Sequence, residues 1–165
     1  MDDRIKEALH QAYAGEAKAA LRLKVFAKKA DEEGVPQVAK LFRAIAFSEE
    51  VHGERALRLL REIRSTQENL EESFQSETGV AQVAYDRFLK LAYHAGDKGV
   101  AWHFTQSRDV EEGHARLYKS ALNDLIADRV TQYYVCSVCG YVSDGVLPDE
   151  CPICRATKEK FVHFE

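Results

Sequence analysis

Apolar residues recur every three or four positions through residues 2–128, which is the period of a helix that buries one face. The pattern predicts four helices, over residues 2–33, about 36–63, from a break at 64–67 to about 95, and from 97 to about 128. Gly34 and Gly96 are typical residues after a helix end, and Pro36 suits a first helical position. We therefore expect two helical hairpins.

The two hairpins form an internal repeat. Phe26, Phe42, Glu49 and His52 recur 62 positions later as Phe88, Phe104, Glu111 and His114, whereas Glu16 recurs after 61 positions as Glu77. The third helix therefore holds one extra residue between Glu77 and Phe88. A single insertion inside a helix is typical of a π-bulge, and Gly79 would ease the distortion.

The pattern changes near Thr131 to short β-rich pieces with tight turns. Tyr133-Tyr134-Val135 leads into two C-x-x-C units, and Phe161 to Phe164 suit a closing strand. We expect a mainly α fold with two domains, a helical bundle over residues 1–130 and a small β-rich metal-binding domain over 131–165.

Composition narrows the classes of partner. The 165 residues allow one ordinary domain and a small module, and a net charge of −4 gives no support for a nucleic-acid or membrane-surface protein. The amino terminus lacks the apolar run of a signal peptide, and no stretch is long and apolar enough to span a membrane. The cytoplasm is the expected location.

Acidic and imidazole side chains interrupt the apolar faces. Glu49 and His52, like Glu111 and His114, lie three positions apart and thus on one helix face, and Glu16 and Glu77 interrupt the other two helices. One Glu from each of two helices and one Glu-x-x-His from each of the others is the ligand pattern of carboxylate-bridged dimetal bundles.

An isolated Glu-x-x-His is more often an ion pair on a solvated face. Two such pairs in register within a repeat, with two further glutamates on core faces, favour a metal centre. Burying an uncompensated carboxylate costs several kcal/mol, and two divalent cations would neutralise the four carboxylates. Oxygen ligands with imidazole suit iron or manganese.

The four cysteines predict a second metal site. Cys136 and Cys139 are separated by eleven residues from Cys151 and Cys154, and four thiolates from two turns suit iron or zinc. Gly140 follows the first pair as in a rubredoxin knuckle, whereas Arg155 stands in the equivalent place after the second. A structural zinc ribbon is the alternative.

A Glu-x-x-His repeat followed by a short-spaced cysteine module resembles rubrerythrin over essentially the whole chain. The resemblance implies a ferritin-like four-helix bundle followed by a small β-rich rubredoxin-like domain. It also implies two irons in the bundle, one iron in the cysteine site, and reduction of hydrogen peroxide to water. Electrons would come through the cysteine-bound iron from a reductase or rubredoxin fed by NAD(P)H.

By the same resemblance, Tyr85 matches a family tyrosine beside the metal site, and the di-iron ligands are Glu16, Glu49, His52, Glu77, Glu111 and His114. Two positions depart from the family pattern. Val80 stands where a seventh ligand, a glutamate that exchanges an iron with a histidine, is expected, and Leu23 replaces a tyrosine. Metal binding keeps a six-ligand set, but efficient peroxide reduction then lacks its mobile carboxylate.

Two other classes remain open. One is a ferritin-like ferroxidase, dioxygen-reducing oxidase or iron-handling protein in which the four-cysteine site is structural. The other is a non-catalytic bundle with a zinc ribbon that binds a partner. A red ferric-thiolate colour that bleaches on reduction would separate the peroxidase from both.

Helix lengths predict exchange between protomers. In a ferritin-like bundle the third helix starts at the opposite end from where the second stops, about 40 Å away for helices of some 28 residues. The break at 64–67 spans only about 14–20 Å. A simple up-down-up-down bundle would avoid the crossover but abandons the repeat symmetry. We therefore expect a homodimer that exchanges its two hairpins.

Overall fold

The computed structural model describes residues 1–127 and 129–164, and the chain divides into two compact units, Met1–Arg64 and Ser65–Glu165. Each unit is described by itself. Among the described residues, no helix combines the length and the apolar character that a membrane crossing requires.

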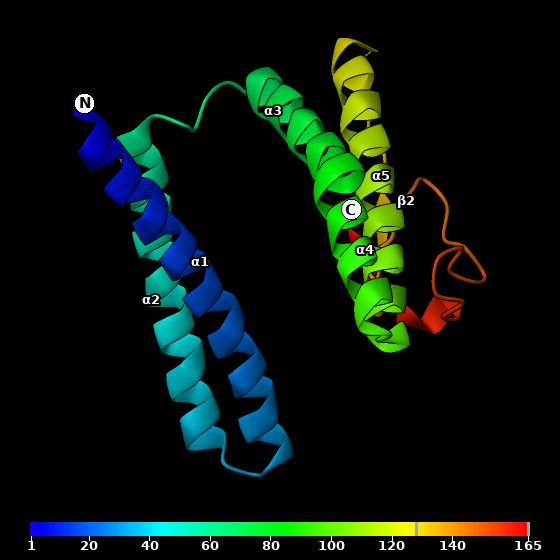
Figure 1. Ribbon diagram of the computed structural model, residues 1–165, viewed down its shortest axis with the longest axis horizontal. Coiled ribbons are helices and arrows are strands. Elements are labelled where there is room, and N and C mark those ends of the chain that lie inside the picture. The colour runs from blue at the N-terminus through cyan, green and yellow to red at the C-terminus, as the bar shows by residue number, and fades with distance from the viewer. Residues whose placement is uncertain (128, 165) are drawn as a thin grey trace. The chain divides into compact units, whose positions relative to one another are not determined.

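The first unit is a helical hairpin. Helices α1 (Asp3–Glu32) and α2 (Pro36–Leu60) lie antiparallel beside each other and are joined by a short turn (Figure 1). Gly34 has φ 73°, a conformation that glycine adopts without steric cost, and Pro36 occupies the start of α2. The predicted helix end at Gly34 and the predicted helix start at Pro36 are thereby confirmed.

Small residues form the seam of this hairpin. The side chains buried between its helices are alanines, with Gly53 also buried. Leu41 is 55% exposed and Leu59 57% exposed, although both belong to the apolar stripe of α2. The physical reason is that two helices share one seam, so half of a broad apolar stripe stays at the surface. The hairpin therefore carries more apolar surface than it can bury alone.

Helix α2 ends earlier than predicted, at Leu60 rather than residue 63. Arg61 adopts the left-handed conformation with φ 60°, and the backbone N–H groups of Arg61 and Glu62 donate to the carbonyls of Arg58 and Leu57. Residues 61–65 alone connect α2 to the next helix.

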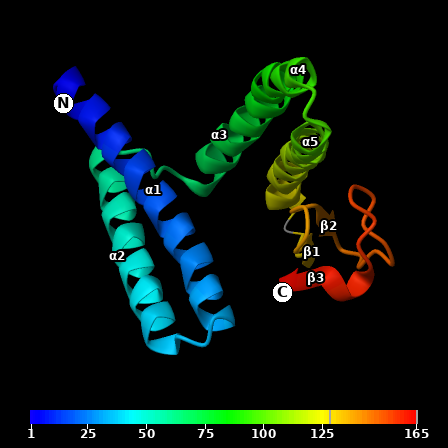
Figure 2. The ribbon, with the colours of Figure 1, turned by 60° about the horizontal axis from the view of Figure 1, so that its bottom comes forward.

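The second unit contains a second helical hairpin. Helix α3 (Thr66–Gly79), a π-helical segment (Val80–Ala84) and α4 (Tyr85–Ala95) form one continuous run, and α5 (Lys98–Ala127) lies beside it (Figure 2). A capping box between Ser65 and Glu68 starts α3, and the Asp97 carboxylate accepts the Val100 N–H at the start of α5. The end predicted for the last helix, α5, at residue 128 lies outside the described residues.

The π-helical segment confirms the insertion read from the repeat. The Tyr85 N–H donates to the carbonyl of Val80, five residues back, instead of four. The extra residue is thus absorbed between Gly79 and Tyr85, on the carboxyl-terminal side of Glu77.

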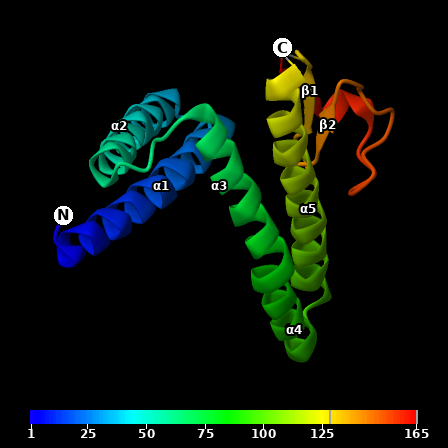
Figure 3. The same cartoon turned by 90° about the horizontal axis from the view of Figure 1, so that it is seen from above.

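The remaining chain forms a three-stranded antiparallel sheet in the order β2-β1-β3. Its strands are β1 (Tyr133–Cys136), β2 (Val142–Asp144) and β3 (Phe161–Phe164), with a 3₁₀ turn at Lys158–Lys160 before β3. Figure 3 shows β1 and β2 beside the carboxyl-terminal half of α5. The closing strand predicted at Phe161–Phe164 is confirmed.

Charged contacts attach the sheet to α5. The Arg129 guanidinium contacts the Asp124 carboxylate at 2.9 Å and the Asp144 carboxylate at 2.7 Å, and the Thr131 hydroxyl also donates to Asp144. These hydrogen bonds raise the pKa of Arg129, and those from Thr131 and Arg129 lower the pKa of Asp144. We call Asp124, Arg129, Thr131 and Asp144 the clamp.

Candidate metal centres

The first unit brings together Glu16 of α1 with Glu49 and His52 of α2, and we call these three residues the first half-site. Each offers a ligand atom, and these atoms lie within 4.8 Å of one another. The His52 Nδ1 atom lies 3.4 Å from the Glu49 carboxylate and 3.9 Å from that of Glu16. The two helices pack closely here, since a Cβ at the buried Gly53 would be in ordinary van der Waals contact with the Glu16 Cβ, at 3.8 Å.

The two carboxyl groups of the first half-site compete for one proton. A hydrogen bond to Glu49, partial burial and the negative charge of Glu49 raise the pKa of Glu16, while the same hydrogen bond lowers the pKa of Glu49. A cation between them would replace the shared proton and remove the repulsion.

The second unit brings together Glu77 of α3 with Glu111 and His114 of α5, which we call the second half-site. Their ligand atoms also lie within 4.8 Å of one another. The His114 Nδ1 atom is 2.9 Å from the Glu111 carboxylate, and the Nε2 atom is 3.2 Å from the carbonyl oxygen of Gly140. The His114 side chain is 25% exposed, against 52% for His52.

Burial is stronger at the second half-site, and it affects the charge there. Burial, followed by the negative charge of Glu111, raises the pKa of Glu77. A cation bound between Glu77 and Glu111 would stabilise the ionised form of both carboxyl groups. The donor set of each half-site, two carboxylates and one imidazole, suits iron or manganese.

Tyr85 and Val80 flank the π-helical segment. The Tyr85 ring packs at 5.8 Å on Phe88 and 6.2 Å on Phe104, measured between ring centroids. Phe88 and Phe104 also pack on each other at 5.4 Å, and their counterparts in the repeat, Phe26 and Phe42, pack at 5.8 Å in the first unit. Val80 is half-buried and has no donor atom in its side chain, so its position on the helix offers no metal ligand.

The four cysteines converge into a cage. The Sγ atoms of Cys136 and Cys154 are 3.7 Å apart, and those of Cys139 and Cys151 are 3.6 Å apart. Tetrahedral coordination at about 2.3 Å from a metal requires sulfurs roughly 3.8 Å apart. The cage therefore has the dimensions of a four-thiolate metal site.

Two similar turns build the cage. The Gly140 N–H donates to the Cys136 carbonyl at 2.9 Å, and the Arg155 N–H donates to the Cys151 carbonyl at 3.0 Å. Gly140 has φ 84° and Arg155 has φ 63°, so the arginine adopts the conformation that the first turn gives to glycine.

The thiols of the cage differ in acidity. Burial raises the pKa values of Cys139 and Cys154. For Cys136 burial acts in the same direction, but hydrogen bonds from the backbone N–H groups of Cys139 and Val138 outweigh it and lower its pKa. Four crowded thiols cannot all ionise without a cation, which fits a metal site.

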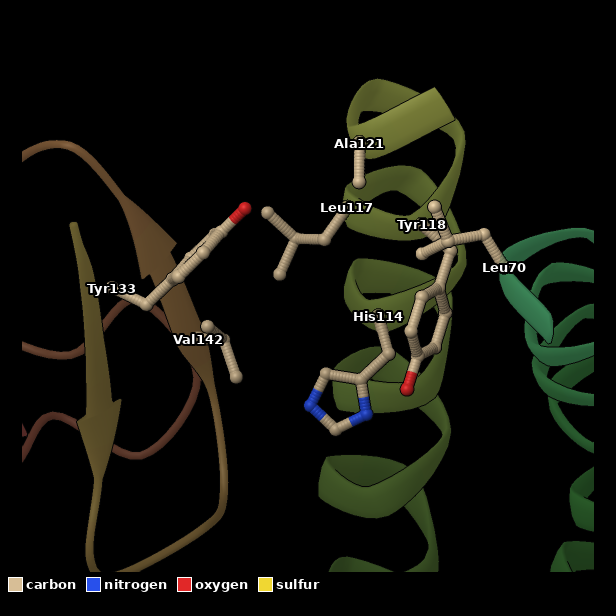
Figure 4. Close-up of a pocket in the computed structure, with 7 residues that line it drawn as sticks. All are labelled: Leu70, His114, Leu117, Tyr118, Ala121, Tyr133 and Val142. Atoms are coloured by element: carbon tan, nitrogen blue, oxygen red, sulfur yellow. The ribbon is translucent and has the colours of Figure 1, made fainter. Parts of the chain in front are cut away.

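Three features of the second unit have no signal in the sequence. They are the His114–Gly140 contact, the clamp, and a largely apolar cavity of about 420 Å³ beside His114. Figure 4 shows the cavity between the sheet and α5, with the Tyr118 phenol extending toward the His114 ring. Its lining residues are Leu70, His114, Leu117, Tyr118, Ala121, Tyr133 and Val142.

Comparisons with known proteins match both the helical part and the cysteine-containing part of the chain. The family model described as Rubrerythrin matches residues 7–122, and the model of the rubrerythrin rubredoxin-like domain matches residues 134–162. Nigerythrin from Nitratidesulfovibrio vulgaris is 30% identical over 96% of this chain and 85% of its own. Rubrerythrin-2 from Clostridium acetobutylicum is 27% identical over 94% of each chain.

Solved structures are also similar. Nigerythrin in its mixed-valence and fully reduced, all-ferrous states matches with a TM-score of 0.60 and 30% identity, over 96% of this chain and 86% of that chain. The predicted fold class, a ferritin-like bundle followed by a rubredoxin-like domain, is confirmed, and with it the cofactors of such a protein, a di-iron site and a rubredoxin-like iron. The chain belongs to the rubrerythrin family.

Proposed function

We propose that this chain reduces hydrogen peroxide to water at a di-iron site, with electrons relayed through the cysteine-bound iron. The observation that carries the proposal is the 3.2 Å contact between His114 Nε2 and the Gly140 carbonyl. It sets a turn of the cysteine cage against a ligand of the second half-site within one unit. Electron relay between the two centres requires such a close approach, whereas oxidation of ferrous iron by dioxygen does not require it.

The proposed ligands of the di-iron site are the two half-sites, Glu16, Glu49, His52, Glu77, Glu111 and His114. Within this set, His114 would bind through Nδ1, because Nδ1 faces Glu111 and Nε2 faces a carbonyl oxygen. When bound, the iron pair supplies the two electrons that convert one peroxide and two protons into two waters. Tyr85 is proposed to act beside this site, at the edge of its aromatic cluster.

We also propose that the site is completed by exchange of hairpins in a homodimer. The five residues 61–65 reach about 18 Å at most. Helix α2, with 25 residues, is about 38 Å long. A ferritin-like crossover needs the longer distance, and the exposed Leu41 and Leu59 supply apolar surface for a second hairpin.

The electron donor is proposed to be an NAD(P)H-linked reductase or a rubredoxin, and the cytoplasm to be the compartment. Four cysteines in metal-site spacing suit a reducing environment. The functional division is proposed at residues 130 and 131, where the bundle ends and the electron-receiving domain begins.

Anaerobic stopped-flow mixing tests this function. The fully reduced protein should consume hydrogen peroxide and regain the red ferric-thiolate absorption of the cysteine site in the same reaction, with two electrons lost per peroxide. A colourless, zinc-bearing cage, together with oxidation of added ferrous iron by dioxygen, would instead support the ferroxidase or iron-handling alternative.

A further inference from the structure

We propose that the cysteine cage is a structural part of the second half-site, so that metal in the cage raises the metal affinity of Glu77, Glu111 and His114. This inference rests on the proposed function in one respect only, that the second half-site binds a metal. It adds that the two centres are coupled in their loading.

The first step is the orientation of His114. Its Nδ1 atom faces the Glu111 carboxylate, and its Nε2–H donates to the Gly140 carbonyl, 26 positions away in the chain. A hydrogen bond on the second nitrogen of a histidine ligand fixes its tautomer and ring orientation and makes the ligating nitrogen more basic. Gly140 is therefore the positioning residue of this imidazole.

The second step is the dependence of Gly140 on the cage. Gly140 directly follows Cys139, and its N–H closes the turn by donating to the Cys136 carbonyl. Metal bound to Cys136 and Cys139 would hold this turn closed, whereas without metal no metal–sulfur bond restrains it. Metal in the cage would therefore restrain the position of the Gly140 carbonyl relative to the His114 Nε2 atom.

The third step is the attachment of the turn to α5. A Cβ at Gly140 would lie 3.8 Å from the Val110 Cγ1 atom, one helical turn before His114. The clamp between Arg129, Asp124 and Asp144 holds the sheet to the same helix further along. Because the turn lies against α5 at Val110 and the clamp holds the sheet to the same helix, we expect movement of the turn to reach the helix face that carries His114.

The first half-site supplies an internal comparison. His52 is 52% exposed, and its Nδ1 atom lies 3.9 Å from the Glu16 carboxylate and 3.4 Å from that of Glu49. Within the part of the chain that the structure describes, its Nε2 atom has no hydrogen-bond acceptor. Coupling to the cage should therefore be confined to the second half-site.

The test uses the full-length apoprotein, kept reduced. One sample receives one equivalent of Zn²⁺ per chain, which the thiolates retain, and the other receives none. Both are titrated with Mn²⁺, a probe of oxygen and imidazole sites, with free Mn²⁺ followed by EPR. We expect the first Mn²⁺ to bind about 10- to 100-fold more tightly to the zinc-loaded protein.

Variants locate the effect. Glu49→Ala disables the first half-site and should keep the zinc-dependent difference, whereas Arg129→Ala loosens the clamp and should reduce it. Glu150→Ala, which breaks an exposed ion pair with Arg155 in the same module, is the matched control and should leave it unchanged. In ¹⁵N-histidine NMR spectra, zinc should shift the His114 ring signals and leave those of His52 in place.

The outcomes separate the two proposals. Equal Mn²⁺ affinity with and without zinc, together with unchanged His114 signals, would overturn the coupling and leave the proposed function standing. Absence of Mn²⁺ binding in both samples would overturn the assignment of the second half-site as a metal site, and the coupling with it, whereas peroxide reduction is tested separately by the stopped-flow reaction.

Discussion

The imidazole of His114 and the carbonyl oxygen of Gly140 lie 3.2 Å apart and join two candidate metal centres that the sequence presents as separate. One partner belongs to a carboxylate-rich helical site and the other to a turn of the cysteine cage. Electron relay and metal loading can both use this contact, and the predictions below concern the groups around it.

Glu111→Ala should remove at least one bundle metal per chain and most of the peroxide reduction, because it deletes a carboxylate 2.9 Å from the His114 ring. Glu49→Ala should act in the same way at the first half-site. Metal analysis of the purified variants checks this. Glu112→Ala, at the exposed neighbouring position, should retain the metal. Two bundle metals retained in both ligand variants would contradict the assignment.

Val80→Glu should raise the rate of peroxide reduction, since it restores a carboxylate three residues after Glu77 at the start of the π-helical segment. The rates are compared under saturating electron donor. Val83→Glu places the same charge at a 72% exposed position of that segment and serves as the control. If Val80→Glu and the unmodified protein turn over equally fast, the missing glutamate has no consequence here.

Co-refolding a Glu16→Ala chain with a Glu77→Ala chain should restore about half of the activity if hairpins are exchanged. In the mixed dimer one site carries both substitutions, and the other site is intact. Activity is measured on isolated heterodimers, with each single variant as the inactive reference. Heterodimers without activity would mean that each chain builds its own site.

Arg155→Gly should stabilise the rubredoxin-like module by about 1 kcal/mol, because glycine adopts the left-handed conformation without the steric cost of a Cβ. The lost ion pair with Glu150 is mostly exposed and contributes little. Denaturant unfolding of the zinc-loaded protein measures the gain. Arg155→Ala removes the same ion pair but keeps the Cβ, so it should give no stabilisation.

The metal-free bundle should lose stability as the pH rises, and Glu77→Gln should weaken that loss. The folded-state pKa of Glu77 is raised above its ordinary value of 4.5. Its contribution is therefore fully present below about pH 4.5 and disappears as the pH rises through the raised value. Unfolding midpoints across this range measure the slope, and Glu71→Gln, exposed on the same helix, should leave it unchanged.

Several elements were predictable because their causes lie within a few residues. Gly34 and Gly96 end helices through their own backbone freedom, and Ser65 with Glu68 starts one through a local capping box. The π-helical segment followed from counting positions between repeat halves. The ligand candidates followed from the cost of placing carboxylates on an apolar helix face.

The apolar stripe of α2 shows what hydrophobic periodicity alone does not predict. It identifies the apolar face of α2, but only the folded hairpin decides which part of that face is buried. Small residues such as Ala46 and Gly53 form the close seam, and Leu41 and Leu59 remain at the surface. The early end of α2 at Leu60 likewise depends on Arg61 adopting a conformation that its residue type disfavours.

The sequence by itself therefore determined the helical repeat, the two sets of candidate metal ligands and the β-rich module, since each follows from local spacing and side-chain chemistry. Only the tertiary structure decided that the Gly140 turn lies against His114 and that Arg129 joins α5 to β2. Those contacts link positions 15 to 26 residues apart, and no local pattern encodes them. They arise because the sheet packs against one particular helix, α5, and tertiary packing determines which helix that is.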